Sequence, residues 1–256
     1  MPEDIQIVFW FLLLLIPAYY LGMPLVIRFQ QRVAAHPNFT PLDFYQLSPV
    51  MSQFLMSRTK CLFDMGFEEP TLVQVPNAVP HVSAYLIMLV NRPAGDKAMV
   101  SVVVSEQAAM QACMVEFNTR WDTGQVFNTH NIPELLWPPE PMSVRTQVPS
   151  LQDPRKLYQL HTFIMNKHGL AGKKVLYGPE EALDYLARFA FREPCEEKVR
   201  RGWYYFDPAK DCYRPTLKGA YLLTWGLMQP FKAFRKLALL RRERKTLEEF
   251  EQAGGS

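Results

Sequence analysis

A long uncharged stretch, Ile5–Ile27, dominates the hydropathy pattern, with 23 consecutive residues that carry no charged side chain. A helix of that length would rise about 35 Å at roughly 1.5 Å per residue, and the hydrocarbon core of a bilayer is about 30 Å thick. Pro17 and Pro24 do not exclude a spanning helix, because neighbouring groups or water can bond the carbonyls that proline leaves free. The pattern predicts a single transmembrane helix within residues 1–33.

Two alternatives to a membrane span remain open, a cleaved signal peptide and a buried helix of a soluble protein. Signal peptides have a basic start and a shorter apolar centre, whereas this stretch follows Glu3 and Asp4. The small residues Val33–Ala35 resemble a cleavage site, but Arg28 and Arg32 separate them from the apolar stretch. Soluble cores seldom need so long an apolar helix, so the membrane span is the favoured interpretation.

The flanking charges predict how the chain faces the membrane. Arg28 and Arg32 follow the apolar stretch and no Lys or Arg precedes it, which favours a cytoplasmic location for the following residues. The cysteines form no close pair or CxxC, as is typical of a reducing compartment; they are Cys61, Cys113, Cys195 and Cys212. The sequon Asn38–Thr40 would matter only on a lumenal side. We therefore expect a single-pass protein of the cell membrane, with its soluble domain on the cytoplasmic side.

After the span, the pattern predicts one helix and then an antiparallel sheet. Ser48 is a suitable cap and Pro49 a suitable first residue for a helix that ends at Gly66. Apolar and β-branched runs predict strands at Thr71–Val75, Val82–Val90, Met99–Val104, Cys113–Thr119, Gln125–Thr129 and Ser143–Val148. The loops between them favour hairpins, and strands without polar alternation need cover on both faces.

The region after the sheet reads as a stiff connector followed by helices. Prolines in Pro133–Pro149 favour an extended connector with local polyproline II structure, and its one PxxP spacing leaves a docking motif open as a lesser alternative. Asp153 and Pro154 predict the start of a helix that ends at Gly169. A short strand is expected at Val175–Tyr177. A further helix opens at Pro179–Glu181 and is expected to stop at Glu193–Pro194.

The last segment combines an apolar run with a basic helix. Gly219–Phe231 is uncharged over 13 residues, which suits an interfacial or re-entrant segment. Lys218–Lys245 holds eight basic residues and one acid, and its pattern after Pro230 is amphipathic. Such a helix is expected to lie on an anionic leaflet. The predicted membrane-contact residues are Trp225, Phe231, Lys232, Phe234, Arg235, Lys236, Arg241 and Arg242.

Two alternatives to membrane contact apply to this basic segment. It can pack on its own domain with a solvated charged tail, or it can bind nucleic acid. Nucleic-acid binding is disfavoured because no aromatic residue is interleaved with the charges of Arg241–Lys245.

The predicted fold class is α+β: an N-terminal transmembrane helix, an antiparallel sheet with packed helices, and a C-terminal basic amphipathic helix. The hydrophobic content of 48% and charged content of 21% are ordinary for a folded protein. Four parts are expected, namely an anchor at 1–33, an α+β domain at 34–150, a helical extension at 151–215 and a membrane-surface segment at 216–256.

Three patterns resemble chemical sites without completing one. Asp122–Gly124 matches the tripeptide of aspartic proteases, but it has no second copy, and Asp-x-Gly is ordinary turn chemistry. His161 and His168 share a helix face about 10 Å apart, beyond the reach of one metal ion, so they are expected in a core or interface. Gly169–Lys174 lacks the residues of a phosphate-binding P-loop, although a basic loop can contact phosphate, a lipid headgroup or RNA.

We therefore expect no enzymatic activity, cofactor or resident metal. The predicted function is that of a structural or accessory subunit of a membrane protein assembly, with the lipid bilayer and other membrane subunits as partners and no nucleic acid. The alternative is a membrane-tethered enzyme that acts on a lipid or small molecule in a pocket between the sheet and the later helices.

Overall fold

The computed structural model describes residues 3–37, 39–79, 82–105, 108–132, 141–169, 172–178 and 181–255. Its fold is α+β, as predicted, with one antiparallel sheet, one mixed sheet and several helices. The chain divides into two compact units, one formed by Met1–His36 with Arg188–Ala238 and the other by Pro37–Ala187 with Leu239–Ser256. The four-part division expected from the sequence stays a prediction.

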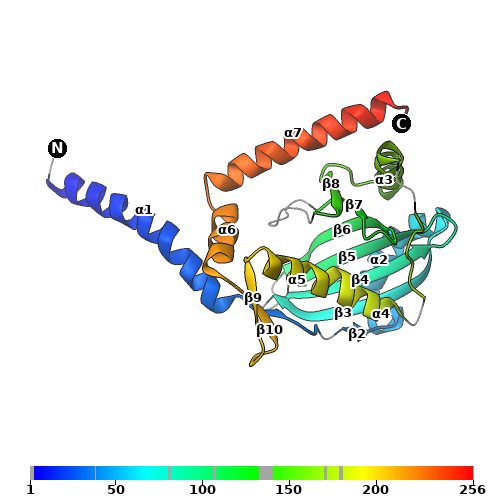
Figure 1. Cartoon of the computed structure of the whole chain (residues 1–256), viewed down its shortest axis with the longest axis horizontal. Coiled ribbons are helices and arrows are strands. Elements are labelled where there is room, and N and C mark those ends of the chain that lie inside the picture. The colour runs from blue at the N-terminus through cyan, green and yellow to red at the C-terminus, as the bar shows by residue number, and fades with distance from the viewer. Residues whose placement is uncertain are drawn as a thin grey trace. The chain divides into compact units, whose positions relative to one another are not determined.

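The second unit is built on a seven-stranded sheet of order β2-β3-β4-β5-β6-β7-β8 (Figure 1). Its strands are β2 (Thr40–Pro41), β3 (Glu68–Val79), β4 (Val82–Asn91), β5 (Asp96–Ser105), β6 (Ala108–Arg120), β7 (Val126–His130) and β8 (Ser143–Gln147). Neighbouring strands are antiparallel except β7 and β8, which are parallel. The predicted strands and hairpins of this region are confirmed, and β3, β5 and β6 are longer than their apolar runs indicated.

Two helices supply the core on one face of this sheet, and a 3-10 turn (Phe44–Gln46) precedes the first of them. In α2 (Pro49–Asp64), the Ser48 Oγ accepts the Met51 N–H at 3.3 Å, as predicted for a cap. In α3 (Pro154–His168), Asp153 caps the start and Gly169 closes the end at φ 59°. Fully buried side chains of both helices pack against alternate residues of β5, β6 and β7; they include Leu55, Leu62, Leu157, Leu160, Val100, Phe117 and Phe127.

The first unit joins distant segments through a three-stranded antiparallel sheet of order β1-β10-β9. These strands are β1 (Val33–Ala34), β9 (Tyr204–Asp207) and β10 (Cys212–Pro215), with α1 (Glu3–Gln30) before β1 and α6 (Leu217–Leu227) after β10. Because β1 and β10 are antiparallel, the end of α1 meets the start of α6, and α6 lies near the C-terminal part of α1 (Figure 1). The Trp225 Nε1–H donates to the Tyr20 carbonyl at 3.4 Å across this pair.

The transmembrane prediction finds no support in this architecture. Across the described ranges, none of the helices combines the length and the hydropathy needed to cross a bilayer. Ile5–Ile27 does fall within the helix α1.

Two local predictions are wrong. The helix expected to stop at Glu193–Pro194 continues, as α4 (Ala182–Tyr185), a π-helical segment (Leu186–Arg192) and α5 (Glu193–Arg200). Pro194 is the second residue of α5 and follows directly on the π-helical segment. Val175–Tyr177 forms no strand, because pairing is limited to one bridge between Trp121 and Lys174. Residues 133–140 of the predicted connector, and Asn38 of the sequon, lie outside the described residues.

Candidate functional site

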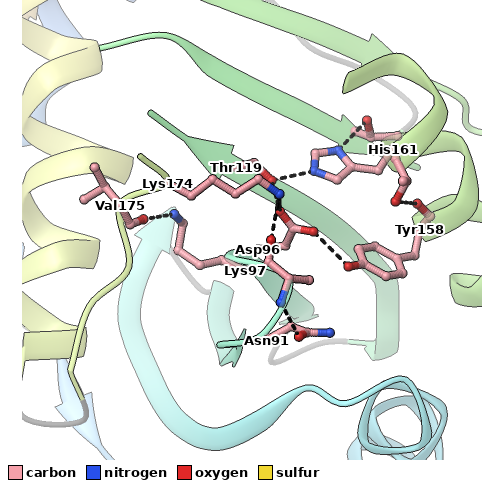
Figure 2. Close-up of polar contacts among 11 residues, drawn as sticks. Asn91, Asp96, Lys97, Thr119, Tyr158, His161, Lys174 and Val175 are labelled. Carbon is pink, nitrogen blue, oxygen red and sulfur yellow. Dashed lines mark hydrogen bonds and ion pairs between the residues drawn. The ribbon is translucent and has the colours of Figure 1, made fainter. Parts of the chain in front are cut away.

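A buried carboxylate organises one end of the second unit. Asp96 begins β5 and is only 2% exposed. Its Oδ1 accepts hydrogen bonds from Thr119 Oγ1 at 2.7 Å and Lys174 Nζ at 2.8 Å, and its Oδ2 accepts one from Tyr158 Oη at 2.8 Å (Figure 2). Because a buried charge is tolerated only when it is paired and hydrogen-bonded, these three donors explain how Asp96 is held there. Burial and the nearby Asp96 charge in turn raise the pKa of Tyr158.

His161 extends this network across the sheet. Thr119 uses its proton toward Asp96, so its oxygen must accept the Nε2–H of His161 at 2.9 Å. The His161 Nδ1 then accepts the hydroxyl proton of Thr129, also at 2.9 Å. Burial lowers the pKa of His161 to about 4 against the opposing Asp96 charge, which agrees with this neutral tautomer. The prediction of a core histidine is confirmed for His161, whereas His168 is exposed and packs edge-on to the Phe127 ring.

A cleft of about 440 Å³ opens beside the network. Its lining comes from the turn before β5 and its first residue, the residue after β6, one side of α3 with Gly169, and the segment around Lys174; the residues are Ala94, Asp96, Trp121, Tyr158, Thr162, Met165, Asn166, Gly169, Gly172 and Lys174. The Lys174 Nζ also donates to the Ala94 carbonyl at 2.7 Å and lies 5.7 Å from the centre of the Trp121 ring. The predicted basic loop therefore contributes its last lysine to a cleft wall.

Lys97 carries a second buried ammonium close to this carboxylate. Successive strand residues face opposite sides of a sheet, so Lys97 points away from Asp96 and donates to the Val175 carbonyl at 2.7 Å (Figure 2). Burial lowers the pKa of Lys97 to about 7, aided by Arg120 and opposed by Asp96.

The face of the sheet that carries Lys97 also holds a second polar cluster, which no sequence pattern indicated. Glu116 on β6 and His130 on β7 are directly paired positions, and Arg145 lies on the next strand, β8. Burial raises the pKa of Glu116 to about 7, against the charge of Arg145. Burial and Arg145 together lower the pKa of His130 to about 4. His130 is 2% exposed, and its ring nitrogens have no hydrogen-bond partner within the described ranges.

The predicted membrane-contact residues are divided between two helices and two units. Trp225 lies in α6, and the others lie in α7 (Phe231–Gln252). Trp225 and Phe231 stack with ring centres 5.9 Å apart, and Arg235 donates to the Gly226 carbonyl at 3.2 Å. The side chains of Trp225, Phe231 and Phe234 are 39%, 43% and 63% exposed, whereas Arg241 and Arg242 belong to the second unit. The structure thus brings together the residues around the junction of α6 and α7.

The second half of α7 matches the alternative of packing on its own domain. Phe250 belongs to the core cluster of the second unit. Glu243 is 5% exposed and its Oε1 accepts the Ser150 N–H at 2.7 Å. The C-terminal end of α7 is therefore packed against the second unit. Near the start of α7, the apolar side chains of Phe231, Phe234 and Leu237 are exposed.

The remaining sequence candidates have structural roles. Asp122 lies in the turn after β6, its N–H donates to the Lys173 carbonyl at 2.9 Å, and Gly124 adopts φ 85°. The turn interpretation of Asp122–Gly124 is confirmed. Over the described part of the chain, no group of three or more His, Cys, Asp or Glu side chains is placed to hold a metal ion.

No family model, curated protein or solved structure matches this chain.

Proposed function

We propose that this protein is a single-pass, membrane-anchored structural or accessory subunit of a membrane protein assembly, without catalytic activity of its own. The observation that carries the proposal is the set of large apolar side chains left exposed along the helix pair α1 and α6. On α1 they include Trp10, Leu15, Tyr19, Leu21, Leu25, Val26 and Phe29, and on α6 they include Leu222, Trp225 and Leu227, all at least 39% exposed.

Exposed apolar side chains in this number on one helix favour lipid over water. Isolated exposed apolar residues are common, but larger contiguous patches mark membrane or protein interaction sites. The exposed residues of α1 fall within or next to the uncharged stretch Ile5–Ile27, where an aqueous surface would be expected to carry charges. We therefore assign the bilayer as the first partner, with neighbouring membrane subunits as the second.

The charges near one end of this helix pair support the cytoplasmic orientation. Arg28 lies in the last turn of α1 and Lys218 in the first turn of α6, and the pairing of β1 with β10 places these turns at the same end of the pair. Basic residues that flank an apolar segment favour the cytoplasmic side. The domain that follows Arg28 is accordingly proposed to be cytoplasmic.

The test is extraction from membranes of the host that expresses the full chain. A protein anchored by α1 is expected to stay in the membrane pellet after high salt and after carbonate, and to be released by detergent. Release of the intact chain by carbonate would refute the anchor. Purification in mild detergent followed by identification of stoichiometric partners then tests the subunit role, and a monodisperse chain with no partner would contradict it.

A membrane-tethered enzyme that acts on a lipid or small molecule remains a second candidate because titratable groups converge at the cleft. Asp96, Tyr158 and Lys174 all line it. Asp96 is buried among three donors, whereas Lys174 is partly exposed and uses two of its three donors, so Lys174 is the better placed to bind a ligand. Turnover that is lost in Lys174→Met, while the association with partner subunits persists, would favour this candidate.

A further inference from the structure

Lys174 has one donor more than its surroundings use. An ammonium group carries three N–H donors. Two are taken by the Ala94 carbonyl and by Asp96, and the centre of the Trp121 ring lies 5.7 Å from the Nζ. The Lys174 side chain is 29% exposed, and it lines the cleft. The third donor is therefore available to an acceptor that enters from solvent.

The carboxylate beside Lys174 is closed to such a molecule. Asp96 is 2% exposed, and Thr119, Tyr158 and Lys174 already donate to its oxygens. At this low exposure it presents little surface to a further donor or to a cation from the cleft. Any ligand must instead present its own acceptor to Lys174.

The local charge favours an anion of low valence. Lys97 and Lys174 lie on the two sides of Asp96, and each lowers the pKa of nearby bases. Among the residues that line the cleft, Lys174 carries the cationic group and already pairs with Asp96, so it suits an anion with a single negative charge. A dianion would be repelled by Asp96 while finding one free donor on Lys174.

The rest of the cleft suits a compact apolar body. Trp121 and Met165, which are 5% and 8% exposed, form an apolar part of the cleft wall, and Ala94 also lines the cleft. Gly172 adopts φ 143°, and a Cβ there would lie 2.9 Å from the Asp122 Oδ1, so this part of the rim requires glycine. The volume of about 440 Å³ is in the range of small-molecule pockets.

We propose that this cleft binds a small monocarboxylate with a compact apolar body, its carboxylate on Lys174 and its body against Trp121 and Met165. The proposal is independent of the membrane anchor, because every residue it uses lies in the second unit.

Calorimetric titration of the full chain in mild detergent tests the site, with benzoate as the probe at constant ionic strength. Benzoate is expected to bind with a Kd of about 1 mM or tighter. Benzamide, which lacks the charge, and acetate, which lacks the body, are each expected to bind at least about tenfold more weakly. Failure of benzoate to bind would overturn the proposal. Preferential binding of inorganic phosphate or of benzamide would overturn the assigned ligand class.

Three variants locate the binding. Lys174→Met is expected to weaken benzoate binding at least about tenfold, whereas Lys173→Met, at the exposed neighbouring position, should leave it within about twofold. If Lys174→Met fails to fold, Asn166→Phe decides, because Asn166 is an exposed helix residue on the cleft wall and the larger side chain would fill the cleft. Unchanged benzoate affinity in a folded Asn166→Phe would place the ligand elsewhere and refute the proposal.

Discussion

The Nε2 atom of His161 lies 2.9 Å from the Oγ1 atom of Thr119, and the proton of Thr119 is committed to Asp96. This relationship fixes the imidazole tautomer and ties α3 to the strand edge on which Asp96 begins β5. Since His161 is fully buried, both of its hydrogen bonds are made inside the core. These buried hydrogen bonds therefore link α3 to the strands β5, β6 and β7.

His161→Leu is expected to lower the free energy of unfolding by about 2 to 4 kcal/mol, because the hydroxyls of Thr119 and Thr129 lose a buried partner. Urea denaturation measures the change. Thr119→Val in the His161→Leu background should cost less than Thr119→Val alone, since the pair is already broken. His168→Leu is the matched control on the same helix and should shift stability by less than about 1 kcal/mol, because His168 is exposed.

Glu116 should make stability fall as the pH rises. Its pKa in the folded protein is raised from 4.5 to about 7, so the folded state binds the proton more tightly than the unfolded chain. The stability that protonated Glu116 contributes to the folded state is fully present below about pH 4.5 and is lost by about pH 7. Glu116→Gln is expected to be more stable than the wild type above pH 7, by up to about 3 kcal/mol, with the difference vanishing toward pH 4. Equal pH profiles for both proteins in chemical denaturation would contradict this.

Neutral His161 should make the free energy of unfolding change with pH in the opposite direction, falling as the pH falls. Its pKa falls from 6.5 to about 4 on folding, so the unfolded chain binds the proton more tightly. Stability is expected to fall as the pH drops from about 6.5 to 4. A variant that lacks this imidazole but remains folded, such as His161→Gln, should show a flatter profile in that window. An unchanged slope would place the acid sensitivity in other groups.

Gly219→Ala should disturb the start of α6. A Cβ at this position would clash with the Trp203 carbonyl oxygen, and the backbone must move to relieve the contact. Cys212 on the adjoining strand is 5% exposed, and we expect its thiol to be labelled faster by maleimide, as followed by peptide mass spectrometry. Gly22→Ala is the control, because nothing lies within 4 Å of its added Cβ. Slow labelling of Cys212 in both variants would contradict the close approach.

A matched pair of arginine substitutions separates lipid contact from ordinary exposure. Leu21 on α1 and Val50 on α2 are 57% and 78% exposed. If α1 lies in the bilayer, Leu21→Arg should reduce the membrane-bound fraction because a charge in hydrocarbon costs about 2.5 to 3.5 kcal/mol on insertion scales. Val50→Arg should have no effect on flotation with membranes. Equal behaviour of the two variants would argue that α1 faces water.

Much of the second unit was readable from local pattern. Ser48 and Asp153 mark helix starts because their oxygens cap backbone N–H groups within one turn, and Gly169 marks an end because it tolerates a positive φ. The strands followed from their apolar, β-branched runs. The predicted stop at Pro194 is wrong, because the proline follows a π-helical segment and the helix continues into α5.

The polar sites depended on contacts that no local pattern encodes. Asp96 meets Thr119, Tyr158 and Lys174 across separations of 23, 62 and 78 residues. The pairing of Glu116 with His130 depends on the register of β6 and β7, and a shift of one residue would turn either side chain to the other face.

The sequence by itself determined the helix boundaries set by capping, the strands set by apolar runs and the uncharged stretch that motivates a membrane anchor, because each rests on interactions between near neighbours in the chain. Only the tertiary structure decided which buried groups meet. Lys174 becomes the partner of Asp96, and α6 becomes the neighbour of α1, through strand pairing that closes long loops. The free energy of a buried charge depends on those distant partners, so the candidate binding cleft emerged only in three dimensions.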